Sequence, residues 1–279
     1  MPNRSCAPYL LTPGPLTTSS TVKRAMLRDW GSRDRAFIAM TARIRERLVR
    51  LARAEATHTC VPLQGSGTFV VEAMLGTLVP RNGHLLVLVN GAYGERMAEV
   101  ARYHGRAVTT LATPEDRPSD VAELGRTLAA DRAISHVAAV YCETTSGILN
   151  PIEQIATVTA RAGRRLLIDA MSAFGALPFD ARAVAFDAVA ASANKCLEGV
   201  PGVGFAIVAK DALAGAEGNA PALSLDLFDQ WTAMDRTGQW RFTPPTQVLA
   251  ALHQALVEHE APRAGSPGAA AATARTAAS

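Results

Sequence analysis

Short apolar runs alternate with segments of helical spacing along most of the chain. Runs without charged residues, such as LLVLV at 85–89 and HVAAVY at 136–141, are typical of strands that are buried on both faces. The segments between them are about ten residues long, which is enough to connect parallel strands. The alternation therefore predicts an α/β fold in which helices cover both faces of a parallel sheet. The expected strands are 85–89, 107–111, 136–141, 165–169, 188–191 and 203–208, and the expected helices are 93–103, 121–130 and 152–162.

The composition favours a folded protein with a sizeable buried core. Of the 279 residues, 48% are hydrophobic and 19% are charged. The formal net charge of +3 is small for this length and argues against nucleic acid as the main partner, although it leaves room for a local basic pocket that binds a small anion. No run of about 18 uncharged apolar residues predicts a membrane span, and no apolar segment near Met1 predicts a signal peptide.

The four cysteines show no metal-ligand spacing. Cys6, Cys60, Cys142 and Cys196 include no close pair, and no histidine stands beside them at such a spacing. We therefore expect no metal site. Isolated thiols are typical of a reducing compartment, so we expect the protein in the cytoplasm.

The end of the chain differs in composition from the rest. From Ala261 it reads APRAGSPGAAAATARTAAS, without an acidic residue or a large apolar side chain. Proline and glycine oppose a helix at its start, and nothing in it could anchor a helix to a core. We therefore expect residues 1–258 to form the folded domain and residues 259–279 to be a mobile, Ala-rich tail.

A lone lysine stands before a Gly-rich turn, in SANKCLEGVPGVGF at 192–205. Lys195 follows one expected strand, and Asp169 ends another, about one strand–helix–strand unit earlier. Because ligands bind beyond the carboxyl ends of parallel strands, both side chains could face one crevice. Such a pair suits pyridoxal phosphate, whose aldehyde would form a Schiff base with the lysine while the carboxylate keeps the ring nitrogen protonated. On spacing alone, a surface lysine and a helix-capping aspartate explain the pair equally well.

Three further stretches could complete such a site. The GSGT turn at 65–68 precedes a segment of helical spacing, and small residues that open a helix leave N–H groups free for a phosphate. Taken alone, this turn is more often a structural helix entry. Tyr93 in NGAYGER could stack on a flat ring or could be a core tyrosine. Polar residues 143–146 in CETTSG could bind the ring hydroxyl of a cofactor or merely cap turns.

Together these stretches resemble the class V pyridoxal-phosphate-dependent aminotransferases, which have fold type I. The likeness spans roughly residues 10–258 and rests on many matches in one order, which are more specific than any single motif. The matching stretches are LLTPGPLTTS, DWGSRD, CVPLQGSGTF, NGAYGER, CETTSGILNP, IDAMSAFGALP, SANKCLEGVPGVGF, SLDLFDQW and TGQWRFTPPT. The resemblance implies a mainly parallel, seven-stranded sheet between helices, pyridoxal 5′-phosphate as the cofactor, and a homodimer with shared active sites.

The resemblance also implies roles for individual residues. Lys195 would form the Schiff base and Asp169 would pair with the ring nitrogen, so these two are the implied catalytic residues. Thr243 would reach the phosphate in the neighbouring subunit, and Gly14 would lie close to the bound substrate. The implied cofactor-binding residues are Ser66, Gly67, Thr68, Tyr93, Thr144, Asp169, Asn194, Lys195 and Thr243.

Within the class, the chain is most similar to the members that act on 2-aminoethylphosphonate and pyruvate. The implied reaction gives phosphonoacetaldehyde and L-alanine, and both substrates are anions that need positive charge or N–H donors. Members of the class also have a C-terminal small domain with an arginine for the substrate carboxylate, and the likeness fades near Glu258, before that domain. Two alternatives stay open. One is a serine– or alanine–glyoxylate aminotransferase, and the other is a remnant that binds the cofactor or a partner without turnover.

Overall fold

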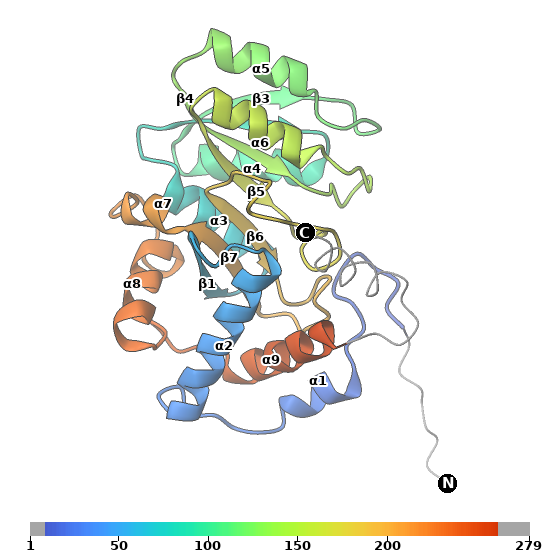
Figure 1. Cartoon of the computed structure of the whole chain (residues 1–279), viewed down its shortest axis with the longest axis vertical. Helices are drawn as coiled ribbons and strands as arrows, with labels where there is room; N and C mark the ends of the chain where they lie inside the picture. The colour runs from blue at the N-terminus through green and yellow to red at the C-terminus, as the bar shows by residue number, and fades with distance from the viewer. Residues whose placement is uncertain (1–8, 262–279) are drawn as a thin grey trace, which may run out of the picture.

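The computed structural model describes residues 9–261, which form a sheet with helices on both of its faces (Figure 1). The seven strands of this sheet lie in the order β1-β7-β6-β5-β4-β2-β3. They are β1 His58–Gln64, β2 His84–Val89, β3 Ala107–Ala112, β4 Ile134–Val140, β5 Arg165–Asp169, β6 Ala188–Ser192 and β7 Val203–Ala209. Six strands run in one direction, and β7 is antiparallel to both of its neighbours. The predicted α/β fold with a mainly parallel sheet is confirmed.

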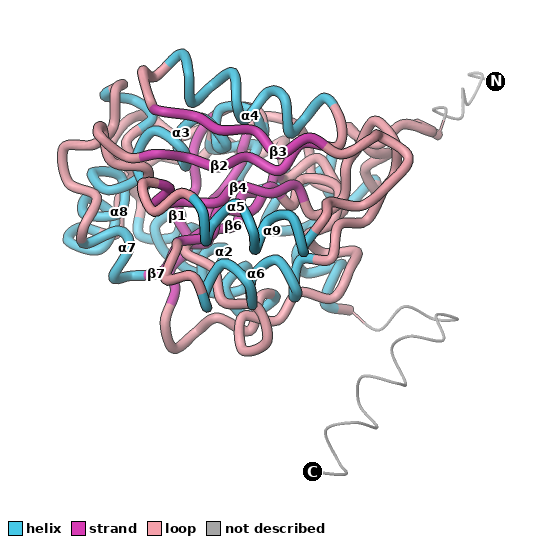
Figure 2. The backbone as a smooth tube through the Cα atoms, turned by 90° about the horizontal axis from the view of Figure 1, so that it is seen from above, coloured by secondary structure: helices cyan, strands magenta, loops and turns pink. Residues whose placement is uncertain are grey.

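The helices form two layers, and Figure 2 shows the strands between them. The helices are α1 Ser20–Ala25, α2 Arg35–Leu51, α3 Gly67–Leu78, α4 Ala92–Tyr103, α5 Val121–Ala130, α6 Ile152–Arg161, α7 Lys210–Ala214, α8 Leu227–Thr237 and α9 Thr246–Glu260, with a short 3-10 helix η1 at Leu223–Leu225. One face of the sheet carries α2, α5, α6 and α9, and the other carries α3, α4, α7 and α8. Within residues 9–261, no helix is both long and apolar enough to cross a membrane.

The side chains of the central strands alternate between the two layers, because successive side chains of a strand point to opposite faces. In β2, Leu86 and Leu88 join the core on the side of α2 and α9. Leu85, Val87 and Val89 join the core on the side of α3 and α4. Since both faces are covered, both sets are apolar, which explains the continuous apolar runs in the sequence.

Every predicted strand and helix is present, with bounds that agree within two residues. β1 was not predicted, because HTCVPLQ contains Pro62 and ends in a polar residue. Proline is tolerated in this strand because β1 lies at the edge of the sheet. The expected strand–helix–strand unit before Lys195 is wrong, since the connection from β5 to β6 contains turns and no helix. Of the predicted tail, residues 259 and 260 belong to α9, and residues 262–279 lie outside the described residues.

Arg106 holds the C-terminal end of α3. Its buried guanidinium donates hydrogen bonds to the carbonyl oxygens of Gly76 at 3.1 Å, Val79 at 3.1 Å and Asn219 at 2.9 Å. The last carbonyls of a helix have no intrahelical partner and carry its partial negative charge, so a cation stabilises them. Arg106 thereby fixes the position of α3 from the end that lies away from the carboxyl edge of the sheet.

Replacing Arg106 by methionine should destabilise the fold, because three carbonyls lose a buried donor. We expect Arg106→Met to lower the free energy of unfolding by about 2–4 kcal/mol, measured by urea denaturation. Arg81 makes similar bonds to loop carbonyls from an exposed position, so the control Arg81→Met should cost less than about 1 kcal/mol. Equal losses for the two variants would contradict a special role for the buried guanidinium.

Candidate functional site

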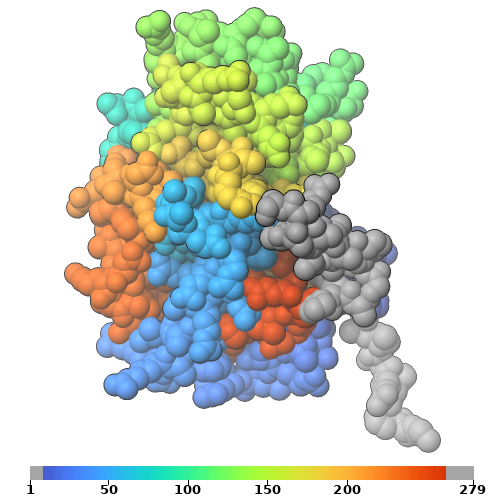
Figure 3. Space-filling view, viewed as in Figure 1, coloured from blue at the N-terminus to red at the C-terminus, as the bar shows by residue number. Residues whose placement is uncertain are grey.

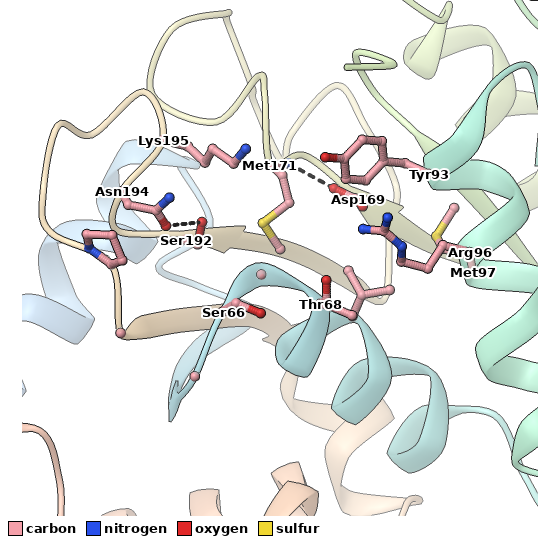
Figure 4. Close-up of a pocket in the computed structure, with 15 residues that line it drawn as sticks. Ser66, Thr68, Tyr93, Arg96, Met97, Asp169, Met171, Ser192, Asn194 and Lys195 are labelled. Atoms are coloured by element: carbon pink, nitrogen blue, oxygen red, sulfur yellow. Dashed lines mark hydrogen bonds between the residues drawn. The ribbon is translucent and has the colours of Figure 1, made fainter. Parts of the chain in front are cut away.

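A cavity of about 480 Å³ lies at the carboxyl ends of β1, β2, β5 and β6 (Figure 4). Parallel strands end at the same edge of a sheet, so residues that are far apart in the sequence meet there. Because β7 runs the opposite way, its N-terminal end adds Pro201 and Gly202 to the same edge. The lining residues are Gly65, Ser66, Gly67, Thr68, Val71, Tyr93, Arg96, Met97, Asp169, Met171, Ser192, Asn194, Lys195, Pro201 and Gly202.

Lys195 lies in the loop that joins β6 to β7. The loop is tied to the sheet at its start, where the N–H of Ala193 donates to the carbonyl of Val203 at 3.0 Å. It is also closed on itself, because the N–H of Gly199 donates to the carbonyl of Ala193 at 2.8 Å. Of the three lysines in the chain, Lys195 lines the cavity, and the other two lie in α1 and α7.

Gly14 lies against the side chain of Lys195. A Cβ atom at this position would lie 2.4 Å from Cδ of Lys195 and 2.9 Å from its Nζ. The φ angle of Gly14 is +152°, which also favours glycine. The segment stays in place because the N–H of Leu16 donates to the carbonyl of Asn194 at 3.2 Å. The predicted substrate-loop glycine therefore contacts the lysine amine, although it is not among the lining residues.

The carboxyl group of Asp169 is buried at the end of β5. It is 2% exposed, and its Oδ1 accepts the N–H of Met171 at 2.9 Å. Burial raises the pKa of Asp169 to about 6, against the lowering effect of that N–H; Glu143 also raises the pKa, and Lys195 and Arg96 lower it. A carboxylate that is buried with little compensating charge would be stabilised by a protonated ring nitrogen in the cavity.

The N-terminal end of α3 opens onto the cavity. Ser66 is its N-cap residue, and the hydroxyl of Ser66 makes no capping hydrogen bond. The first N–H groups of a helix have no intrahelical acceptor and carry its partial positive charge, so this end can bind an anion. Gly67 packs closely on Met171, since a Cβ atom there would lie 2.6 Å from Sδ of Met171 and would displace that side chain. Thr68 adds a hydroxyl to the lining of the cavity, as Figure 4 shows.

The first turn of α4 brings Tyr93 and Arg96 to the cavity. The fully buried Glu143 accepts the N–H groups of Tyr93 at 3.5 Å and Gly94 at 3.4 Å, and so caps this helix. The guanidinium carbon of Arg96 lies 4.8 Å from the centre of the Tyr93 ring. Arg96 was not among the predicted site residues, although its position three residues after Tyr93 on an expected helix places both on one face. Met171 was not predicted either, although it lies in the IDAMSAFGALP stretch two residues after Asp169.

Two predicted cofactor-binding residues do not line the cavity. The hydroxyl of Thr144 lies 2.6 Å from Oγ of Ser172, beyond the end of β4. Thr243 is exposed and lines a separate hollow of about 370 Å³ together with Arg33 and Trp240. The other predicted residues of this set come together in the cavity: Ser66, Gly67, Thr68, Tyr93, Asp169, Asn194 and Lys195.

The donor set of the cavity fits a flat ring that carries an aldehyde and a phosphate. The amine of Lys195 can bond to an aldehyde carbon, and the N-terminal end of α3 offers donors to a phosphate. Tyr93 offers an aromatic face to the ring. Pyridoxal 5′-phosphate combines these features, and the strongest point for the fit is that buried Asp169 requires a positively charged partner. Among residues 9–261, no cluster of His, Cys, Asp and Glu is suited to hold a metal ion.

The chain is similar to known proteins along most of its length. The family model described as aminotransferase class V matches residues 18–257. The chain is 58% identical over 255 residues to the 2-aminoethylphosphonate–pyruvate transaminase of Pseudomonas putida (strain W619), which covers 91% of this chain and 69% of that protein. It is 59% identical over 252 residues to 2-aminoethylphosphonate–pyruvate transaminase 2 of Burkholderia lata, covering 90% of this chain and 67% of that protein. The crystal structure of pyridoxamine–pyruvate aminotransferase from Mesorhizobium loti matches with a TM-score of 0.84 at 25% identity, covering 93% of this chain and 67% of that chain.

The raised pKa of Asp169 makes the stability of the cofactor-free protein depend on pH. The pKa is about 6 in the folded protein against an ordinary value of 3.8, so the contribution of Asp169 to stability is full below about pH 4 and is lost as the pH rises through 6. We expect Asp169→Asn to raise the free energy of unfolding by about 1–3 kcal/mol at pH 8 and by little at pH 4, measured by urea denaturation. The exposed control Asp116→Asn should change neither value. No gain at pH 8 would show that the native carboxylate is already compensated.

Proposed function

The chain belongs to the class V aminotransferase family, and from this membership we propose that it transfers the amine of 2-aminoethylphosphonate to pyruvate. The products of this reaction are phosphonoacetaldehyde and L-alanine. The observation that carries the proposal is the 58% identity to a 2-aminoethylphosphonate–pyruvate transaminase over 255 residues, a span long enough to include every residue that lines the cavity. The chain covers 69% of the length of that relative.

We propose pyridoxal 5′-phosphate as the cofactor. When bound, it supplies an electron-poor ring that accepts negative charge from a carbon that loses a proton. Asp169 keeps a proton on the ring nitrogen, because the buried carboxylate is stabilised by that positive charge. Lys195 would bond to the aldehyde carbon, whose oxygen would leave as water, and its free amine would move a proton between carbons of the substrate.

The remaining predicted residues position these two groups. The N-terminal end of α3, with Ser66 and Thr68, binds the phosphate and so sets the place of the ring between Asp169 and Lys195. Tyr93 and Asn194 line the same cavity, and we assign Tyr93 to the ring face. Gly14 contacts Lys195 and so brings the N-terminal segment close to the reacting amine, where it limits the access of water. Thr144 is assigned to the ring oxygen by the resemblance.

We further propose a homodimer with shared active sites. Thr243 is exposed and lies outside the cavity of its own chain, as a residue that serves a partner subunit would. Large apolar side chains are exposed in the same region, with Leu223 70% and Phe242 50% accessible. Their segments are held together because the guanidinium of Arg241 donates to the carbonyl of Leu223 at 2.8 Å. A second copy that covers this surface would remove it from water.

We propose a cytoplasmic location. Cys60, Cys142 and Cys196 are free thiols in the structure. Thiols persist in reducing compartments, whereas disulfides are typical of oxidising ones, so the free thiols support this location.

An assay of amine donors tests the proposed reaction. With pyruvate as the acceptor, we expect L-alanine to form from 2-aminoethylphosphonate much faster than from serine, measured by chromatography of the products. Lys195→Ala should lower the rate by a factor of about 10²–10⁴ or more, because the proton-transfer group is lost. The control Lys210→Ala changes a lysine outside the cavity and should keep the wild-type rate. Alanine from serine alone would favour a serine–glyoxylate-type enzyme, and no alanine from either donor would favour a protein that binds without turnover.

Mixed dimers test whether the active sites are shared. Thr243→Ala should weaken cofactor binding by about 10-fold or more, because a bond to a charged phosphate is lost. A mixed dimer of a Lys195→Ala chain and a Thr243→Ala chain would contain one site with both residues intact. Coexpression should therefore restore alanine formation at low cofactor concentration to well above that of either variant alone. Sites built within single chains would give no such gain.

A further inference from the structure

Arg96 brings to the cavity a positive charge that the predicted cofactor residues do not provide. Its side chain lines the cavity together with Thr68 and Asp169. Figure 4 shows its guanidinium on the side of Asp169 and Thr68, across the cavity from Lys195. Among residues 9–261, no carboxylate forms an ion pair with Arg96. Its charge is therefore available to a ligand.

The guanidinium is held in place by its neighbour on α4. Its central carbon lies 4.8 Å from the centre of the Tyr93 ring, a distance that is typical of a cation–π contact. Glu143 accepts the N–H of Tyr93 and so fixes the turn that carries both side chains. A planar guanidinium that is held over an aromatic face presents its N–H groups at its edges, where they can bind two oxygens of one anion.

The anion site at α3 lacks a full charge of its own. Its donors are helix N–H groups and the hydroxyls of Ser66 and Thr68, all of which are neutral. The other cation that lines the cavity is Lys195, whose amine is needed for the aldehyde. A phosphate carries close to two negative charges at neutral pH, so a charged partner would strengthen its binding.

We propose that Arg96, together with the N-terminal end of α3, binds the phosphate of the cofactor. The inference rests on the proposed cofactor and not on the identity of the amine donor. A phosphonate group of the substrate has the same chemistry, but the substrate amine must react beside Lys195, across the cavity from Arg96. Arg96 therefore binds the phosphate of the cofactor and not the phosphonate of the substrate.

Binding of pyridoxal 5′-phosphate and of pyridoxal, which lacks the phosphate, tests the inference without any substrate. The dissociation constants are measured by equilibrium dialysis of the whole chain at fixed ionic strength. We expect Arg96→Gln to weaken the binding of pyridoxal 5′-phosphate by about 10- to 100-fold and that of pyridoxal by less than about 3-fold, because only the first ligand loses a charge-assisted bond. Arg96→Lys keeps the charge without the planar group, so it should lose less affinity for pyridoxal 5′-phosphate than Arg96→Gln does.

A control on the same helix separates this effect from a general loss of charge. Arg102→Gln removes a guanidinium from the last turn of α4, outside the cavity, and should change neither constant. If Arg96→Gln weakened the binding of both ligands equally, the inference would be overturned. Such a result would show that Arg96 affects binding of the ring, through Tyr93 or Asp169, and not binding of the phosphate. Unchanged binding of both ligands would overturn it as well.

If circular dichroism shows that Arg96→Gln does not fold, Arg96→Lys carries the test, and its loss must again be confined to the phosphorylated ligand. A loss confined to that ligand, in a protein that makes no alanine from 2-aminoethylphosphonate, supports the role of Arg96 and contradicts the proposed substrate.

Discussion

The site depends on a carboxylate that the fold keeps away from water. Asp169 ends a central strand, and its backbone is paired with Ala190 of the adjacent strand β6. The carboxyl group lines the cavity but is only 2% exposed, so its charge remains buried and its pKa stays high. The same pairing sets the distance to Lys195, because the lysine loop begins where β6 ends. One strand pair thus brings a buried carboxylate and an amine to opposite sides of one cavity.

Among the helices that start at this edge of the sheet, α3 and α4 open onto the cavity, and they differ in what their N-terminal ends bind. The end of α4 is already occupied, since the carboxylate of Glu143 accepts the N–H groups of its first turn. The end of α3 has no such internal anion, and the Ser66 hydroxyl does not cap it. This contrast supports the proposal that an anionic ligand binds at α3, whereas α4 contributes side chains to the cavity. Arg106, at the opposite end of α3, satisfies the carbonyls there, so the helix is capped by the protein at one end and open to a ligand at the other.

The sequence predicted the fold and most of the cavity for physical reasons that are local. Apolar runs such as 85–89 indicate doubly covered strands, and the rule for strand ends then brings Asp169 and Lys195 together. β1 was not predicted because Pro62 interrupts the strand pattern of residues 58–64. Its pairing with β7 joins residues that are far apart in the sequence and is known only from the structure. Arg96 ends the NGAYGER stretch but was given no role there, and its place in the cavity follows from the phase of α4. The proposed role of Thr243 could not follow from residue patterns alone, because the residue does not line the cavity of its own chain.

The antiparallel direction of β7 limits how the loop that carries Lys195 can move. Because β6 and β7 are neighbours that run in opposite directions, the loop between them returns directly to the sheet and is bonded at Ala193 to Val203. The start of the lysine loop is therefore held by the sheet, and Gly14 lies against the Lys195 side chain. Any travel of the amine must come from rotations of its own four-carbon stem. The range of positions open to the Lys195 amine is therefore set by the torsion angles of one side chain. A longer or more mobile loop would extend this range but would fix the position of the amine less well.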